Sequence, residues 1–137
     1  SKNKKLIDMT LVTSQNHSNQ ILNNLIDLMT FKESVRMGSI GCKIASILRG
    51  ESDIYLSLSL PGKSSPKDWD FAAPEAILRG AGGRITNLDN EELIYNKKDF
   101  KQEGLIIATS DSTKHGQICL EIKEVLKKNK KLSKFLI

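Results

Sequence analysis

The sequence is poor in cysteine, in aromatic residues and in long apolar runs, and each shortage argues against a class of protein. Its two cysteines, Cys42 and Cys119, stand far apart and form no C-x-x-C pair, so neither a disulfide framework nor a zinc site is indicated. Aromatic residues make up 5% and are scattered, whereas base stacking needs them beside basic residues. No apolar run reaches the roughly 18 to 20 residues that cross a bilayer. We therefore expect a cytoplasmic protein that binds neither nucleic acid nor membrane.

What the sequence does have is a modest excess of positive charge. Twenty-one Lys and Arg face 16 Asp and Glu, for a net charge of +5 over 137 residues. This excess permits an anionic partner. Part of it lies in a C-terminal lysine run, which at the end of a helix would complement the helix dipole, so a solvated helix end is favoured over a nucleic-acid or membrane contact. The run comprises Lys127, Lys128, Lys130, Lys131 and Lys134.

Apolar spacing alternates between the periods of strands and helices along the chain. Helices are predicted near 21–29 with Ser18 as the N-cap, at 40–48, at 70–79 with Pro74 in or next to the first turn, and from Asp111 or Ser112 through about 126. Strands are predicted at 9–13, 34–37, 53–60, 84–88, 92–95 and 105–109, the fourth and fifth as a hairpin. Strands separated by helices predict an α/β fold: a three-layer αβα domain with a mostly parallel mixed sheet.

One segment, from Lys67 to Gly83, carries the strongest chemical signal. Asp70 stands where a loop becomes a helix, and the helix dipole keeps such a carboxylate ionised and available to a hard cation such as Mg²⁺. Small residues follow, which would let this helix pack close to a neighbour. From the residue types alone, Asp70 is either a plain N-cap or a metal ligand.

Two upstream segments add residues suited to binding an anion. Lys43 is a point cation suited to a phosphate, and Ser39 stands at a glycine-flanked helix start whose N–H groups favour anions. From the residues alone, Lys43 could equally be a solvated helix residue, and His17 could be a polar loop residue.

Together these segments resemble the lithium-sensitive, Mg²⁺-dependent inositol monophosphatase superfamily. Residues 69–83 meet the pattern Trp-Asp-x-x-Ala-Pro-Glu-x-Ile-Leu-x-x-x-Gly-Gly, which is most similar to the 3'(2'),5'-bisphosphate nucleotidase branch. Residues 14–19, Ser-Gln-Asn-His-Ser-Asn, are similar to the Ser-or-Thr-Arg-Ser-His-Ser-Asn element of that branch, and residues 38–43, Gly-Ser-Ile-Gly-Cys-Lys, to its Gly-Gly-x-Gly-x-Lys element. The resemblance implies the C-terminal half of the sugar-phosphatase fold.

The resemblance also implies roles for individual residues. Asp70 would be a Mg²⁺ ligand, and Ser14, His17, Ser39 and Lys43 would contact an adenosine bisphosphate.

The sequence departs from the branch at three positions. Gln15 replaces an arginine, Ser39 stands where glycine is frequent, and an arginine that some relatives carry near Ser57 is missing. These departures bear on the choice of substrate.

Most of the superfamily's metal-binding elements have no counterpart in this sequence. A Glu-Glu element, an Asp-Pro-x-Asp-Gly-Thr element and an upstream Asp do not occur, and Glu91-Glu92 is interpreted as the exposed edge of the predicted hairpin. We therefore expect residues 1–137 to be the C-terminal domain of an inositol monophosphatase-like phosphatase, with the N-terminal catalytic and metal-binding half as its partner.

The resulting functional hypothesis is a Mg²⁺-dependent phosphatase that removes the 3'-phosphate of adenosine 3',5'-bisphosphate, or of its 5'-phosphosulfate analogue, in sulfur assimilation. This chain would supply the nucleotide-facing domain and one metal ligand, and would be inactive alone. The alternatives are an inositol-phosphate or fructose-bisphosphate phosphatase on the same fold, or, if the chain is native as it stands, a non-catalytic nucleotide-binding or assembly module.

Overall fold

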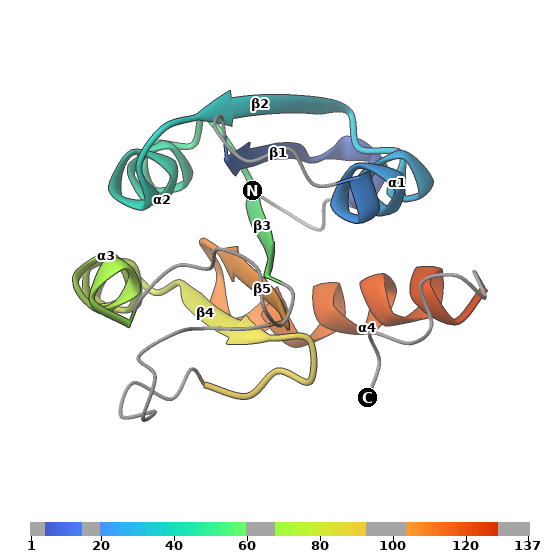
Figure 1. Ribbon diagram of the computed structural model, residues 1–137. Helices are drawn as coiled ribbons and strands as arrows, with labels where there is room; N and C mark the ends of the chain where they lie inside the picture. Colours follow the sequence, from blue (N-terminus) through green and yellow to red (C-terminus); the bar gives the residue numbers. More distant parts are fainter. Residues whose placement is uncertain (1–4, 15–19, 60–67, 93–103, 129–137) are drawn as a thin grey trace.

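The computed structural model describes residues 5–14, 20–59, 68–92 and 104–128. These residues form a five-stranded sheet between two pairs of helices (Figure 1). In chain order the elements are η1 (Leu6–Asp8), β1 (Thr10–Ser14), α1 (Gln20–Met29), β2 (Glu33–Met37), α2 (Ile40–Leu48), β3 (Ile54–Ser59), α3 (Asp68–Gly80), β4 (Arg84–Asn87), β5 (Gly104–Thr109) and α4 (Ser112–Lys128). None of these helices combines the length and apolarity needed to span a bilayer.

The sheet is mixed, with strand order β2-β1-β3-β5-β4. β1 is parallel to both β2 and β3, whereas β5 is antiparallel to both β3 and β4. Four strands therefore point the same way and β5 opposes them. This arrangement confirms the predicted αβα domain with a mostly parallel mixed sheet.

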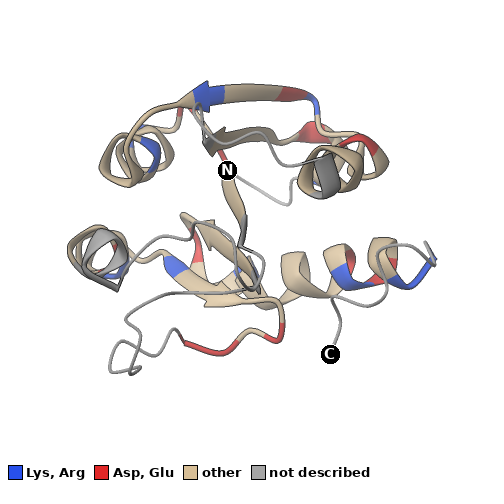
Figure 2. Cartoon of the chain, in the orientation of Figure 1, with Lys and Arg blue, Asp and Glu red and all other residues tan. Residues whose placement is uncertain are grey.

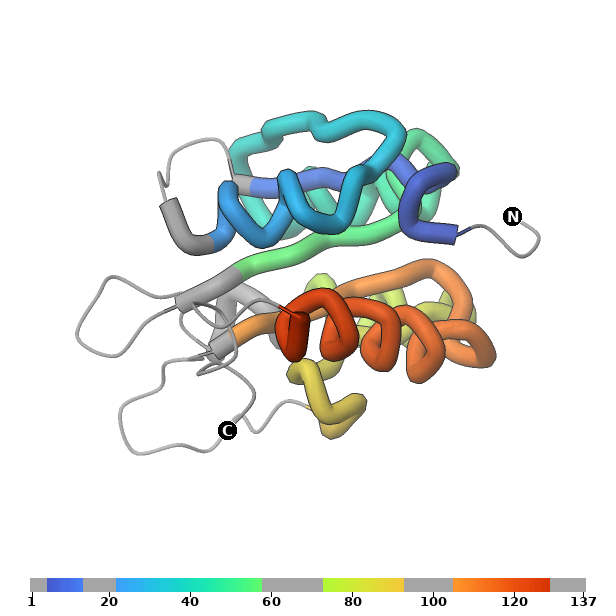
Figure 3. The backbone as a smooth tube through the Cα atoms, turned by 90° about the vertical axis from the view of Figure 1, so that its right-hand side faces the viewer, coloured from blue at the N-terminus to red at the C-terminus, as the bar shows by residue number. Residues whose placement is uncertain are grey.

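The two faces of the sheet are covered by different helices, which gives three layers. On one face, Leu11 of β1 and Leu56 of β3 pack with α1 and α4. On the other face, Val12 and Tyr55 of the same strands pack with α2 and α3. Figure 3 shows α1 and α4 together on the near side of the sheet, with α2 and α3 behind it. Because neighbouring residues of a strand point to opposite faces, apolar residues at consecutive positions bury both faces.

One predicted element boundary differs from the structure. α3 begins at Asp68 rather than Asp70, so Pro74 lies inside the helix instead of in its first turn. Proline has no N–H, so the Asp70 carbonyl lacks its usual donor four residues on. The predicted hairpin is supported as far as it is described, because an antiparallel bridge joins Thr86 to Glu92 while the other side of β4 pairs with β5. Residues 93–95 of the expected second strand and the N-cap Ser18 lie outside the described residues.

The C-terminal end of α3 is fixed by two adjacent glycines with different roles. Gly82 has φ +92° and donates its N–H to the Arg79 carbonyl at 3.0 Å, while Gly83 donates to the Leu78 carbonyl at 2.9 Å. This pair of bonds is the Schellman arrangement. A Cβ on Gly83 would come within 2.5 Å of the Thr109 carbonyl oxygen, so the turn packs directly on the end of β5.

A fully buried histidine links α4 to the sheet. His115 lies between Thr86 of β4, with 2.6 Å from Nε2 to Oγ1, and Thr109 of β5, with 2.8 Å from Nδ1 to Oγ1. The Thr86 hydroxyl donates to the Asn87 carbonyl at 2.8 Å, so it accepts from Nε2–H, and Nδ1 accepts from the Thr109 hydroxyl. Burial, together with the nearby Arg84 guanidinium, lowers the pKa of His115 from 6.5 to about 4.

This lowered pKa predicts an acid-sensitive fold. Below pH 6.5 the unfolded chain binds a proton that the native His115 excludes, so stability falls as the pH falls toward 4 and the loss is complete below that value. The loss amounts to about 3 kcal/mol at most. Urea denaturation at pH 7 and pH 4 should show a smaller pH dependence for His115→Gln than for the native chain. Equal pH dependence in the two proteins would contradict this assignment.

Candidate functional site

The predicted binding residues gather at one edge of the sheet, where the parallel strands end. Ser14 ends β1 and is paired in register with Met37, which ends β2. Ser39 follows two residues later and caps α2. β3 runs parallel to β1, so the chain leaving β3 toward Asp70 on α3 starts from the same edge. The topology therefore brings the ends of the segments that carry Ser14, Ser39 and Asp70 to one side of the molecule.

This edge contains the point where the chain changes its direction of winding. The chain leaves β1 for α1 on one face of the sheet, and leaves the adjacent β3 for α3 on the other face. In open α/β sheets the crevice outside the carboxyl ends of two such strands is the usual ligand-binding position.

The N-terminus of α2 presents free backbone N–H groups at this edge. The exposed Ser39 hydroxyl accepts the Cys42 N–H at 3.1 Å, and the Ser39 carbonyl accepts the Lys43 N–H at 3.1 Å. Within the described part of the chain, the N–H groups of Ile40 and Gly41 then have no acceptor. Free N–H groups at the positive end of a helix dipole favour an anion.

Lys43, one turn further along α2, is buried, with only 3% of its surface exposed. This excludes the alternative of a solvated helix residue. Its Nζ lies 5.1 Å from the centre of the Tyr55 ring on β3. Among the described residues no carboxylate pairs with it, and burial lowers the pKa of its ammonium group. A buried cation without a counter-ion is costly to the fold and is typical of a functional site.

The structure tests the other predicted site residues only through their backbones. Ser14 and Asp70 lie at the end of β1 and in the first turn of α3, but their side chains are outside what is described, and His17 lies outside the described residues altogether. The roles assigned to Ser14, His17, Ser39, Lys43 and Asp70 therefore stay predictions.

The described residues do not form a divalent-cation site by themselves. No group of three or more His, Cys, Asp or Glu side chains comes together among them. Asp70 offers at most one carboxylate at this edge, and Mg²⁺ takes about six oxygen ligands, so most of a metal site would have to come from other residues or from substrate and water. Glu91 and Glu92 are exposed beyond β4, as predicted, and Glu92 lies 3.6 Å from Arg79.

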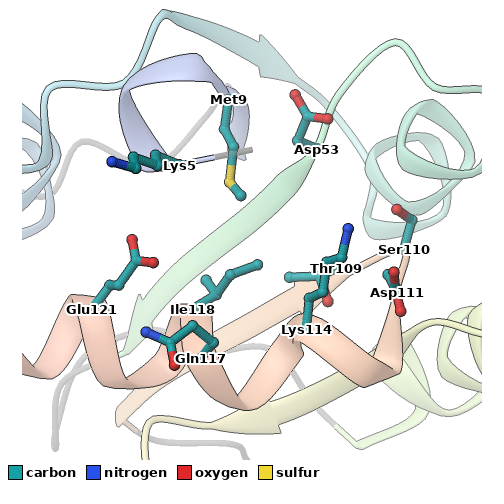
Figure 4. A pocket seen from close by; sticks show the side chains of 10 residues that line it. All are labelled: Lys5, Met9, Asp53, Thr109, Ser110, Asp111, Lys114, Gln117, Ile118 and Glu121. Carbon is teal, nitrogen blue, oxygen red and sulfur yellow. The ribbon is translucent and has the colours of Figure 1, made fainter. Parts of the chain in front are cut away.

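A cavity of about 220 Å³ lies at the opposite edge of the sheet, between η1, the start of β3 and α4 (Figure 4). Its lining includes three carboxylates and two ammonium groups, so it lacks the excess positive charge that a phosphate ester requires. None of the predicted site residues borders it. We therefore place the candidate site at the carboxyl edge and not in this cavity. The charged lining residues are Asp53, Asp111, Glu121, Lys5 and Lys114.

Two buried residues near the site escaped prediction from the sequence. Tyr55 supports the Lys43 ammonium group, and Glu75 of α3, which is 4% exposed, accepts a hydrogen bond from Arg79 at 2.7 Å. Helical spacing contained a signal for the buried lysine, because Lys43 falls on the same stripe as Ile40, Ile44 and Ile47. Glu75 is a fixed position of the pattern that residues 69–83 meet, but the pattern assigned it no role.

The chain matches the inositol monophosphatase family over residues 1–127 and belongs to that family. It is 35% identical over 100 residues to 3'(2'),5'-bisphosphate nucleotidase 1 of Mus musculus, covering 72% of this chain and 31% of that protein. It is 28% identical over 131 residues to inositol monophosphatase 3 of Xenopus tropicalis, covering 89% of this chain and 34% of that protein. The chain thus spans about a third of the length of these relatives.

Solved structures show the same fold. The IMPase of Thermotoga maritima matches with a TM-score of 0.66 and 20% identity, over 93% of this chain and 45% of that one. An inositol monophosphatase from Anabaena (Nostoc) matches with a TM-score of 0.64 and 24% identity, over 98% of this chain and 49% of that one. This chain accordingly matches less than half of each structure.

The burial of Lys43 predicts a conflict between stability and binding. Lys43→Met keeps a similar shape and removes the buried charge, so it should raise the free energy of unfolding by about 1 kcal/mol. Lys32→Met, which alters an exposed lysine, should leave stability nearly unchanged. Urea denaturation of the two variants and the native protein measures the difference. A Lys43→Met protein that is clearly less stable than the native one would show that the ammonium group serves the fold.

Proposed function

We propose that the protein containing this chain is a metal-dependent phosphatase that removes the 3'-phosphate from adenosine 3',5'-bisphosphate, with its 5'-phosphosulfate analogue as a second substrate. This chain would supply the nucleotide-facing wall and one metal ligand. In a cell the reaction would remove a by-product of sulfur assimilation, in the cytoplasm.

The observation that carries this proposal is the 35% identity to 3'(2'),5'-bisphosphate nucleotidase 1 over 100 residues, which cover 72% of this chain. Support comes from the carboxyl edge, where free N–H groups of α2 and the buried Lys43 ammonium group both favour a phosphate. A substrate with two phosphates has use for more than one such group.

The metal would be Mg²⁺, held by Asp70 together with carboxylates from outside this chain. When bound, it would activate a water and stabilise the departing oxygen. Residues of this chain would bind and orient the nucleotide, with Ser39 and Lys43 toward phosphate, and Ser14 and His17 at the end of β1.

The other half of the site would be supplied by a further domain packed on the α2/α3 face. The exposed side of α3 carries Ile77, which is 60% exposed, among the small residues Ala73, Ala76 and Gly80, with Arg79 as the charged residue beside them. Figure 2 shows the charged positions of α4 gathered toward its end, so α4 has a surface suited to water. A domain covering α3 would bring its carboxylates beside Asp70.

A second candidate is an inositol-phosphate phosphatase, which the similarity to inositol monophosphatase 3 over 89% of the chain favours. The two candidates differ in the group attached to the phosphate. An inositol monophosphate has no base and only one phosphate to bind, so the second cationic position would contribute little to its turnover.

The substrate preference is measured with the intact protein by comparing kcat/KM for adenosine 3',5'-bisphosphate, inositol 1-phosphate and fructose 1,6-bisphosphate with Mg²⁺. The bisphosphate nucleotide should be preferred by about tenfold or more, since its second phosphate adds charge-assisted contacts. A preference for inositol 1-phosphate would select the second candidate. Binding of the nucleotide without turnover would instead indicate a non-catalytic module.

The metal role predicts that Asp70→Asn lowers Mg²⁺-dependent turnover by about 100-fold or more, because even the outer-shell partners of a metal contribute 10- to 100-fold. Glu91→Gln is the matched control and should retain activity, since that exposed carboxylate accepts a hydrogen bond from the Asn87 side-chain amide in a surface turn. Both variants are assayed across a range of Mg²⁺ concentrations. Unchanged turnover in Asp70→Asn removes this residue from the proposed mechanism.

The proposed docking of a further domain on α3 predicts that Ile77→Glu destabilises the intact protein by about 3 kcal/mol, because it buries an unpaired charge. Leu120→Glu on α4 is the control, because Leu120 is similarly exposed at 57% and lies on the opposite layer. Thermal melts of both variants measure the loss of stability at each position. Equal effects at the two positions contradict docking on α3.

A further inference from the structure

Among the described side chains, the ammonium group of Lys43 has one partner, an aromatic ring. The group lies 5.1 Å from the centroid of the Tyr55 ring, and Tyr55 is itself 1% exposed. Within the described residues, Lys43 Nζ makes neither an ion pair nor a hydrogen bond. The attraction between a cation and the face of an aromatic ring is therefore what offsets the loss of water around this charge.

Among the described side chains no carboxylate pairs with Lys43, and the one neighbouring charge that acts on it is that of the Cys42 thiol, which raises its pKa. Cys42, the adjacent residue on α2, carries an exposed thiol, and Val12 of β1 is uncharged. From α3, which packs beside α2, the buried ionisable group is Glu75, and its carboxylate accepts from Arg79 at 2.7 Å. The net result is that burial dominates and the pKa of Lys43 is lowered.

The Tyr55 ring is held in place independently of the lysine. It belongs to a buried apolar cluster with Ile47 of α2 and Leu78 of α3. The ring is thus a fixed surface between the core and the edge where the strands end.

We propose that Tyr55 is a positioning residue, whose ring face holds the Lys43 ammonium group charged and aimed for the phosphate of the substrate. This inference rests on the proposed function for the identity of the ligand. It goes beyond that function in assigning the phosphate affinity of Lys43 to a residue that touches no substrate. The ring face carries the role, and the Tyr55 hydroxyl does not.

The first test is a direct titration of the Lys43 amine in the intact protein, by its rate of acetylation against pH, read on the peptide that contains it. Tyr55→Phe keeps the ring and should leave the pKa of Lys43 as in the native protein. Tyr55→Leu should lower it by about one, the range that cation–π energies allow. Ile85→Ala makes a cavity on the same face of the sheet and serves as the control for general loosening.

A second variant covers the case in which Tyr55→Leu does not fold. Pentafluorophenylalanine at position 55 keeps an aromatic ring of similar size but reverses the charge distribution of its face. It should lower the pKa of Lys43 at least as far as leucine does. A Lys43 titration that is the same in the phenylalanine, leucine and fluorinated proteins overturns the proposal.

The second test separates this inference from the proposed function. With adenosine 3',5'-bisphosphate as substrate, the leucine and fluorinated variants should raise KM about tenfold above pH 8 with little change in kcat, and phenylalanine should restore the native KM. A shifted Lys43 titration with unchanged KM overturns the positioning role. If the native protein does not hydrolyse the nucleotide, the proposed function fails, but the role of Tyr55 can still be tested by titrating Lys43 in the presence of inorganic phosphate. Phosphate should raise the pKa of Lys43 in the native and Tyr55→Phe proteins. The rise should be smaller in the leucine and fluorinated variants.

Discussion

The burial of both faces of the central strands is the constraint on which the rest of the molecule depends. β1, β3 and β5 carry buried apolar residues at consecutive positions, so each face needs a helical cover. The chain meets this need by crossing from β1 to β2 on one face and from β2 to β3 on the other. The crossing that leaves β2 and the chain that leaves β3 place the starts of α2 and α3 at the edge where the parallel strands end. The location of the candidate site is thus a consequence of how the core is covered.

Two of the buried polar side chains, His115 and Lys43, are accommodated in opposite ways. His115 is neutral and both of its ring nitrogens have a hydroxyl partner, so it satisfies the usual requirement for a buried polar side chain. Lys43 is a cation that the described residues meet only with an aromatic ring. The first arrangement joins α4 to the sheet and stabilises the fold. The second, an unpaired buried charge, lowers the stability of the fold, and binding of a negatively charged ligand would offset that loss of stability.

Much of this arrangement is legible in the sequence, and the exceptions have physical reasons. Apolar periodicity located α1, α2 and β3, because each buries a regular stripe or alternation. The direction of β5 was not predictable, because a short apolar run reads the same in a parallel or an antiparallel ladder. The start of α3 was placed too late, because Pro74 is typical of a first turn and its presence deeper in a helix depends on packing around it.

The candidate site divides in the same way. Motifs marked Ser39, Lys43 and Asp70, since glycine-flanked helix starts and Trp-Asp segments are local in sequence. The contact between Lys43 and Tyr55 joins α2 to β3, and its existence depends on how the two elements pack, so residue patterns within either element could not show it. Neither the motifs nor the packing of this chain shows which residues of a further domain would complete the site.

The two glycines that end α3 should tolerate different substitutions. At Gly82 the demand is a left-handed backbone with open space around it, and asparagine adopts that conformation tolerably. At Gly83 the demand is the absence of any side chain, because the Thr109 carbonyl occupies the space of a Cβ. Sequence drift in this protein should therefore admit polar substitutes at the first position and none at the second, although the two residues are adjacent and identical.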